Sequence, residues 1–209
     1  MSSALINLAY LVASILFILG LKGLAHPKTA VRANLMGAVG MLLAIVATFL
    51  DRGVLGSGLH AFVLIFAAML IGSAIGAVLA LKIQMTAMPQ MVALLNGFGG
   101  GASVLVAGAA LADVQVASLQ FTIATVASGI IGAVTFWGSL VAFDKLQEFL
   151  LKGAPIHFPG QQPLNAVLAA ACVALGIWLV RDPSAGWIYW VIVAVASVLG
   201  VLLTIPIGG

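Results

Sequence analysis

The chain has 209 residues, of which 64% are hydrophobic and only 6% are charged, whereas soluble globular domains carry about 25% charged residues. This composition excludes a soluble domain, because too little polar surface is available to face water. The formal net charge of +3 does not indicate nucleic-acid binding either, since the basic residues are scattered over short loops and form no patch that could follow phosphates.

Long unbroken apolar runs predict membrane-spanning helices. In lipid every backbone polar group needs an internal partner, and barrel strands would alternate apolar and polar residues. A bilayer core of ~30 Å needs about 20 residues per helix. Seven segments qualify, at residues 4–20, 33–50, 59–81, 91–111, 119–143, 164–180 and 187–204. We therefore expect an all-α, polytopic transmembrane helix bundle of about seven helices, with residues 1–209 as one transmembrane domain.

Basic residues are distributed unequally between the loops that join these segments. The odd-numbered loops hold six of them and the even-numbered loops two. The six are Lys22, Lys28, Arg32, Lys82, Lys145 and Lys152, and the two are Arg52 and Arg181. Because cytoplasmic loops carry the excess of basic residues, we expect the N-terminus outside and the C-terminus in the cytoplasm.

The longest predicted connection covers residues 144–162 on the cytoplasmic side. It combines four charged side chains with Pro155, His157 and Pro159. Two interpretations stay open for it. It is either a docking surface for a soluble partner or an interfacial turn that lies on the lipid headgroups.

Glycines recur at spacings that suit close helix packing. Small residues let helix backbones approach in lipid, where apolar contact alone gives little association energy. Gly72 and Gly76 form a GxxxG pattern in the third segment, and Gly132 and Gly138 lie in the fifth. The stretch 97–102, which begins at Gly97, formally matches a dinucleotide-binding fingerprint. We interpret it as a false positive, because no strand precedes it and it lies within an apolar span.

Few polar side chains fall at membrane depth, and each is a functional candidate because its burial in lipid is costly. Asn96 in the fourth segment is the strongest, followed by Ser139 and Thr135 in the fifth. Hydrogen bonding between helices is the alternative role for the amide. His60, at the outer end of the third segment, is either a proton entry group or an unpartnered interfacial histidine. No carboxylate falls inside a predicted helix, and no pattern indicates a catalytic, cofactor-binding or metal site.

Three stretches resemble a known family. They are GLKGLAHP at 20–27, MTAMPQMVALLNG at 85–97 and IGAVTFWGSLVAF at 131–143. They are similar to the β subunit of proton-translocating NAD(P) transhydrogenase, and the resemblance covers essentially the whole chain in order.

The resemblance implies an enzyme in which hydride passes between NAD(H) and NADP(H) in soluble domains while protons cross a membrane domain shared by α and β subunits. The complete assembly is expected to be a dimer in the bacterial inner membrane. Family β subunits continue with further helices and a soluble NADP(H)-binding domain. We therefore expect this chain to bind no nucleotide cofactor and to transfer no hydride by itself.

One position departs from the family. Many members place a histidine, thought to handle the translocated proton, where this chain has Asn96. An amide does not titrate near neutrality, so we hypothesise that a partner subunit's helix supplies the titrating group. Gly132, Gly138 and Ser139 match family positions associated with coupling. The competing interpretations are a secondary transporter for a small solute, which lacks obvious ligands here, and a structural membrane anchor.

Overall fold

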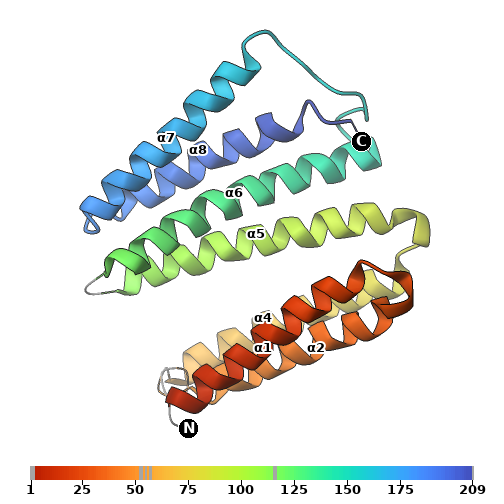
Figure 1. Cartoon of the computed structure of the whole chain (residues 1–209), viewed down its shortest axis with the longest axis vertical. Coiled ribbons are helices and arrows are strands. Elements are labelled where there is room, and N and C mark those ends of the chain that lie inside the picture. Colours follow the sequence, from red (N-terminus) through yellow and green to blue (C-terminus); the bar gives the residue numbers. More distant parts are fainter. Residues whose placement is uncertain (1–2, 52–53, 55, 57, 115–116, 209) are drawn as a thin grey trace. The chain divides into compact units, whose positions relative to one another are not determined.

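The computed structural model describes residues 3–51, 54, 56, 58–114 and 117–208, and these residues contain helices but no strand. In chain order the elements are α1 (Ser3–Leu24), α2 (Pro27–Phe49), α4 (Gly58–Lys82), the short 3₁₀ helix η1 (Met85–Ala87), α5 (Met88–Asp113), α6 (Leu119–Gln147), α7 (Gln161–Arg181) and α8 (Trp187–Thr204) (Figure 1). Seven helices of the described part are long and apolar enough to cross a membrane. The predicted all-α class is confirmed, and the sidedness of the termini stays a prediction.

Two predicted boundaries are wrong. The second helix begins at Pro27 and not at residue 33, because proline is well tolerated in the first helical turn and the exposed Lys28 and Arg32 interrupt only the apolar pattern. The connection expected at 144–162 is also shorter, since α6 continues to Gln147 and α7 begins at Gln161.

The extension of α6 changes the position of two charged residues. Asp144 and Lys145 belong to α6 and not to a loop. Asp144 also corrects the expectation that no carboxylate lies within a helix. Lys145 is only 2% exposed, because its ammonium donates hydrogen bonds to backbone carbonyls. A buried lysine therefore lies at the end of α6, where the sequence predicted a connection between helices.

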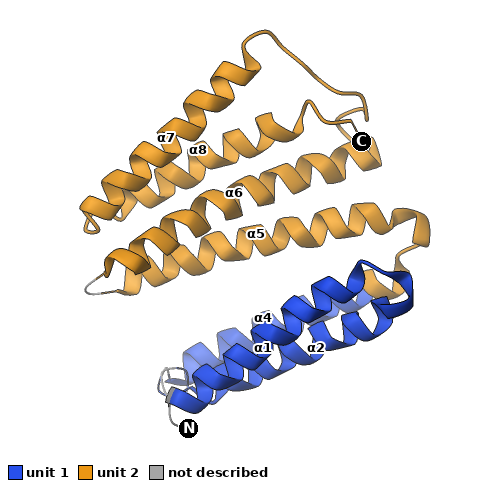
Figure 2. Ribbon diagram, in the orientation of Figure 1, with its two compact units in different colours: residues 1–78 blue, residues 79–209 orange. Residues whose placement is uncertain are grey.

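The chain divides into two compact units, Met1–Val78 and Leu79–Gly209 (Figure 2). In the first unit α1 packs closely along α2. A methyl group added at Gly20 would lie 2.9 Å from the carbonyl oxygen of Ala33, so this crossing needs glycine. Tyr10 and Thr48 join the same two helices through a 2.8 Å hydrogen bond between their hydroxyls. No residue of α4 is buried, although two of its phenylalanines stack on Phe49 at the end of α2.

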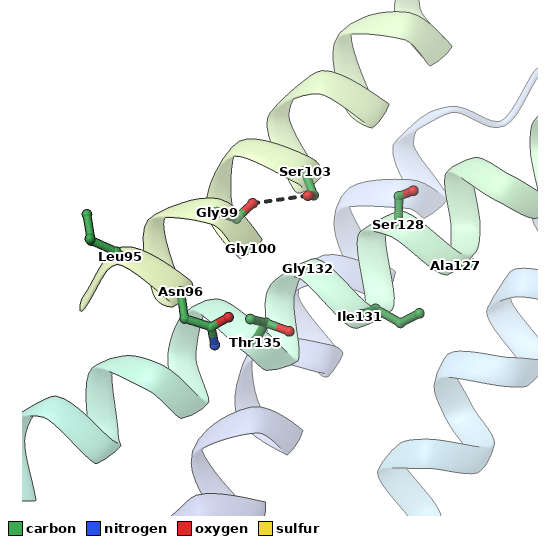
Figure 3. Close-up of a pocket in the computed structure, with 10 residues that line it drawn as sticks. All are labelled: Leu95, Asn96, Gly99, Gly100, Ser103, Ala127, Ser128, Ile131, Gly132 and Thr135. Atoms are coloured by element: carbon green, nitrogen blue, oxygen red, sulfur yellow. Dashed lines mark hydrogen bonds between the residues drawn. The ribbon is translucent and has the colours of Figure 1, made fainter. Parts of the chain in front are cut away.

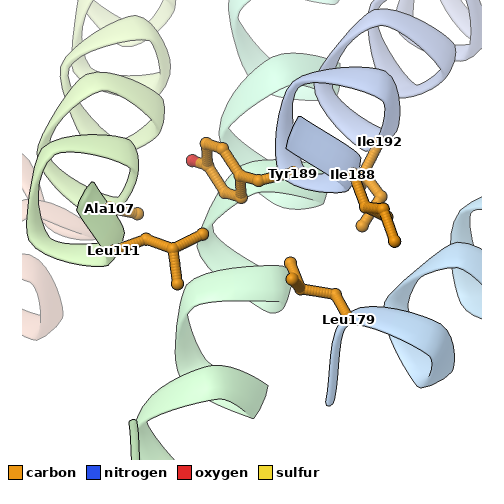
Figure 4. Close-up of a cluster of buried hydrophobic side chains, with 6 residues drawn as sticks. All are labelled: Ala107, Leu111, Leu179, Ile188, Tyr189 and Ile192. Carbon is orange, nitrogen blue, oxygen red and sulfur yellow. The ribbon is translucent and has the colours of Figure 1, made fainter. Parts of the chain in front are cut away.

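The second unit contains the end of α4, η1 and the helices α5, α6, α7 and α8 (Figure 2). Its main core cluster comprises Ala107, Leu111, Leu179, Ile188, Tyr189 and Ile192, contributed by α5, α7 and α8 (Figure 4). The hydroxyl of the fully buried Tyr189 donates a 2.7 Å hydrogen bond to the carbonyl oxygen of Val104 on α5. A phenol buried in an apolar core needs such a partner, so this bond fixes α8 against α5.

Candidate functional site

The site is built around the crossing of α5 and α6, where two glycines bring the backbones together. A methyl group added at Gly100 would lie 2.6 Å from the carbonyl oxygen of Gly132, and one added at Gly132 would lie 2.7 Å from that of Gly100. Real Cβ atoms do not approach backbone oxygens so closely, so any other residue would force the helices apart. The two glycines therefore determine how close the side chains on either side of the crossing come to each other.

An open pocket of about 490 Å³ lies beside this crossing. It is lined by Leu95, Asn96, Gly99, Gly100 and Ser103 of α5 and by Ala127, Ser128, Ile131, Gly132 and Thr135 of α6 (Figure 3). Asn96 and Thr135 project from the two helices near one another, whereas the Ser103 hydroxyl donates to the carbonyl oxygen of Gly99 on its own helix at 3.0 Å (Figure 3). The lining thus combines small residues with an amide and hydroxyls.

A second pocket of about 420 Å³ shares Ser103 and Ser128 with the first and extends to Ala110 and Phe121. We refer to these two neighbouring pockets together as the α5–α6 groove. At 1.5 Å per residue, the stretch of α5 from Asn96 to Ala110 is ~21 Å long, which is most of a bilayer core of ~30 Å. The polar side chains that line the groove are Asn96, Ser103, Thr125, Ser128 and Thr135.

Asn96 is linked to α6 by a hydrogen bond at one end of the groove. Its Nδ2 donates to the Oγ of Ser139 at 2.8 Å. Gly97, the next residue, makes room for this pair, because a methyl group there would lie 3.2 Å from the Cβ of Ser139. The Asn96 side chain is exposed while Ser139 is buried, so the amide lies at the edge of the helix pair with an open side.

The chemistry of the groove is that of a polar path without an ionisable group. Amides and hydroxyls orient water and exchange hydrogen bonds, but they do not titrate near neutrality. No group of three or more metal-ligating side chains occurs in the described part of the chain. Residues 97–102 lie in the middle of α5, so the strand and phosphate-binding turn that a dinucleotide fingerprint needs are not at this place.

The other residues singled out from the sequence are not among those that line the groove. Gly138 faces α8, where a methyl group would lie 2.8 Å from the Oγ1 of Thr204. His60 is exposed near the start of α4, in the other compact unit. No atom lies within 4 Å of the Cβ positions of Gly72 and Gly76. The proposed roles of these residues stay predictions.

Sequence reasoning missed Lys145, which the structure makes a central polar contact of the second unit. The spacing of Lys145 from other residues of α6 could have indicated its burial. Lys145 follows Gly138 by seven residues and Val141 by four, so all three fall on one helical stripe, and all three are buried. A lysine in register with such a stripe indicates a buried position for its side chain.

The seven apolar helices and their glycine crossings define this protein as a polytopic helical integral membrane protein. Comparison with known proteins makes the assignment more specific. Residues 6–209 match the family model described as NAD(P) transhydrogenase beta subunit, and the chain belongs to this family.

Two curated relatives, both NAD(P) transhydrogenase subunit beta from Rhodospirillum rubrum, are each 42% identical to this chain over 217 aligned positions. The alignments cover 100% of this chain and 45% of each relative. The chain therefore spans about half the length of the curated relatives it matches. The resemblance found in the sequence is confirmed.

Proposed function

We propose that this chain forms part of the proton-translocating membrane domain of an NAD(P) transhydrogenase. Protons would cross the membrane beside α5 and α6, coupled to hydride transfer between NAD(H) and NADP(H) in soluble domains. Membership of the beta-subunit family supports the enzyme class. The partners on this proposal are the membrane helices of an α subunit and the soluble NAD(H)- and NADP(H)-binding domains, in a dimeric assembly of the bacterial inner membrane.

The observation that carries the proposal is the α5–α6 groove with the Asn96–Ser139 hydrogen bond at one end. Polar side chains are costly in lipid and are kept where they line a path or hold helices together. Here an amide and hydroxyls from two helices face one hollow and share it with glycines. Hydrogen-bonding groups that line a hollow of this kind support the binding of water there.

The groove lacks a titratable side chain, so the proton-binding group has to come from elsewhere. The open side of Asn96 supports a neighbouring helix as its source, because an exposed amide in lipid needs a polar partner. We infer that a helix of a partner subunit covers the groove and places an ionisable side chain beside Asn96. The amide would then orient that side chain or the water next to it.

Asn96→Leu in the intact enzyme tests this proposal. The variant removes the bond to Ser139 and places an apolar side chain in the groove. We expect proton pumping to fall roughly tenfold, which corresponds to the loss of about one hydrogen bond in the path. The measurement uses the purified complete enzyme in vesicles with an enclosed pH-sensitive dye, and hydride transfer is followed in the same samples.

Asn34→Leu is the matched control, since Asn34 is an exposed helix asparagine of α2. It should leave pumping unchanged. Asn96→Gln keeps an amide and should retain more pumping than Asn96→Leu. Unchanged pumping in Asn96→Leu would refute any role for this residue and would favour a structural anchor. A loss of hydride transfer in both leucine variants would instead indicate failed assembly.

A further inference from the structure

Helix α6 presents two different faces to its neighbours, and each face is marked by a row of residues. Successive residues of an α-helix are rotated by about 100°, so Val134, Gly138 and Lys145 fall within about 40° of one another, whereas Thr135 and Ser139 lie about 100–140° away from Val134. The stripe with Thr135 and Ser139 faces α5 and the groove. The stripe with Lys145 faces α8.

The contact between α6 and α8 is close along its whole length. A methyl group added at Gly200 of α8 would lie 2.8 Å from the backbone of Val134. Further along α6, a methyl group added at Gly138 would lie 2.8 Å from the Oγ1 of Thr204. At the end of the stripe the Lys145 Nζ donates to the carbonyl oxygen of Ile205 at 2.6 Å. Two helices that touch at three successive levels leave little room to slide past each other.

Lys145 reaches beyond the end of α8 to the residues that follow it. Its Nζ also donates to the carbonyl oxygen of Ile207 at 2.7 Å and to that of Ala154, in the connection between α6 and α7, at 3.1 Å. An ammonium has three protons and no acceptor, so these three bonds satisfy it completely. The carbonyls at the end of a helix also carry the negative pole of its dipole, which favours a cation there.

Backbone groups near Lys145 form hydrogen bonds in the same region. The N–H of Ile156 donates to the carbonyl oxygen of Ile205 at 3.1 Å. Next to Lys145, the carboxylate of Asp144 accepts the N–H groups of Leu150 at 3.0 Å and Leu151 at 2.7 Å. The connection after α6 and the exit from α8 therefore converge on two adjacent side chains of one helix.

We propose that Lys145 is a positioning residue that fixes the exit segment, residues 205–207, to the end of α6, so that the two move as one body. This inference rests on the proposed function, because it assigns Lys145 a part in coupling. A displacement of α6 at the groove, where Thr135 and Ser139 lie, is then transmitted to the chain that follows α8. Without the lysine, the exit segment keeps its covalent link to α8 but loses its side-chain attachment to the end of α6.

The test compares Lys145→Gln and Lys145→Arg with the parent protein, all as complete enzyme in lipid vesicles or nanodiscs. Two quantities are measured. The first is amide hydrogen exchange at Ile156 and Ile207, which reports whether the exit segment is held. The second is the number of protons pumped per hydride transferred, which reports coupling and which a merely structural loss of active enzyme would not change.

For Lys145→Gln we expect the rate of amide hydrogen exchange in the exit segment to rise roughly tenfold or more. Buried carbonyls that lose their hydrogen-bond donor destabilise the segment that carries them. The ratio of protons to hydride should fall at least about twofold, since a tenfold weaker attachment leaves a large share of α6 movements untransmitted. Lys145→Arg keeps the charge but holds its donors in a planar fork. It should assemble and show a smaller change of both quantities in the same direction.

Lys152→Gln is the control, because Lys152 is exposed in the connection after α6 and its loss changes the charge equally. Unchanged exchange in Lys145→Gln would overturn the attachment itself. Faster exchange with an unchanged proton-to-hydride ratio would overturn the coupling role. If Lys145→Gln does not assemble, parent-like exchange and ratio in Lys145→Arg overturn the proposal. A parent enzyme that transfers hydride without pumping would overturn the proposed function and leave the exchange result standing.

Discussion

Helices α4 and α6 are both long, apolar and rich in glycine, yet they pack very differently. Gly72 and Gly76 of α4 have no atom within 4 Å of their Cβ positions, and no residue of this helix is buried. In α6 a methyl group at Gly129, Gly132 or Gly138 would meet an atom of another helix at 2.7–2.8 Å. Glycine spacing therefore indicates a face that can pack closely, but it does not indicate which helix packs there.

The difference follows from the physics of lipid. Acyl tails are as apolar as leucine, so two helices gain little by exchanging lipid contacts for each other. What holds α6 in place is backbone contact at its glycines together with hydrogen bonds such as that between Asn96 and Ser139. Among the described residues, the aromatic contacts of helix α4 are the stacking of Phe62 and Phe66 on Phe49. Substitutions that add one methyl group should separate the two cases.

The largest effect is expected for Gly100→Ala at the crossing of α5 and α6. The added methyl group meets the Gly132 carbonyl oxygen at 2.6 Å and the backbone nitrogen of Phe136 at 2.9 Å. Backbone atoms cannot move aside as a side chain can, so the helices must separate. We expect the free energy of unfolding to fall by about 1–3 kcal/mol, measured by denaturant titration in mixed micelles.

The adjacent glycine provides a closely matched control. Gly99→Ala adds the same methyl group one residue earlier, where no atom lies within 4 Å. This substitution should not lower the free energy of unfolding measurably. Equal destabilisation by the two substitutions would mean that the close crossing is not the cause, because alanine has the higher helix propensity and does not by itself destabilise a helix.

This contrast also limits what the sequence could predict. The spans were predictable because each needs only a long apolar run. The partners of the glycines were not, since Gly72 and Gly132 have similar surroundings in sequence and opposite ones in space. The contact between Asn96 and Ser139 was not predictable either, because nothing local relates residues 43 positions apart.

Lys145 shows a second limit of the sequence. Its three acceptors are backbone carbonyls of Ala154, Ile205 and Ile207. A carbonyl is present at every residue, so it leaves no signature in the sequence. The pattern could indicate a buried position for Lys145, but the segments that would hold its charge appear only in the fold.

An intermediate effect is expected for Tyr189→Phe. The substitution keeps the ring in the core but removes the 2.7 Å hydrogen bond to the Val104 carbonyl oxygen. Interhelical hydrogen bonds in membranes contribute about 0.6 kcal/mol on average and up to about 1.7 kcal/mol. Because Tyr189 is fully buried, we expect a loss of about 1 kcal/mol in the same denaturant titration.

The other tyrosine of the chain, Tyr10, provides a comparison for Tyr189→Phe. Tyr10 bonds to Thr48 in the first unit, where the hydroxyls are not buried. Tyr10→Phe should cost less than Tyr189→Phe, since water or headgroups can replace the lost bond. The opposite order would show that the first unit is held together more firmly than its few buried residues indicate.

The smallest effect is expected for Gly72→Ala and Gly76→Ala in α4. The methyl groups enter open space, and alanine in a helix interior is favoured over glycine by about 0.5–1 kcal/mol. The purified chain should therefore be unchanged or slightly stabilised in the denaturant titration. The same variants are then assembled with the partner subunits, and the yield of complete enzyme is measured. A parent-like yield would mean that the two glycines serve no close contact in the assembly. A reduced yield from a chain that is itself stable would show that this face of α4 packs against another helix in the complete enzyme, because a methyl group can obstruct a helix only where another backbone approaches it.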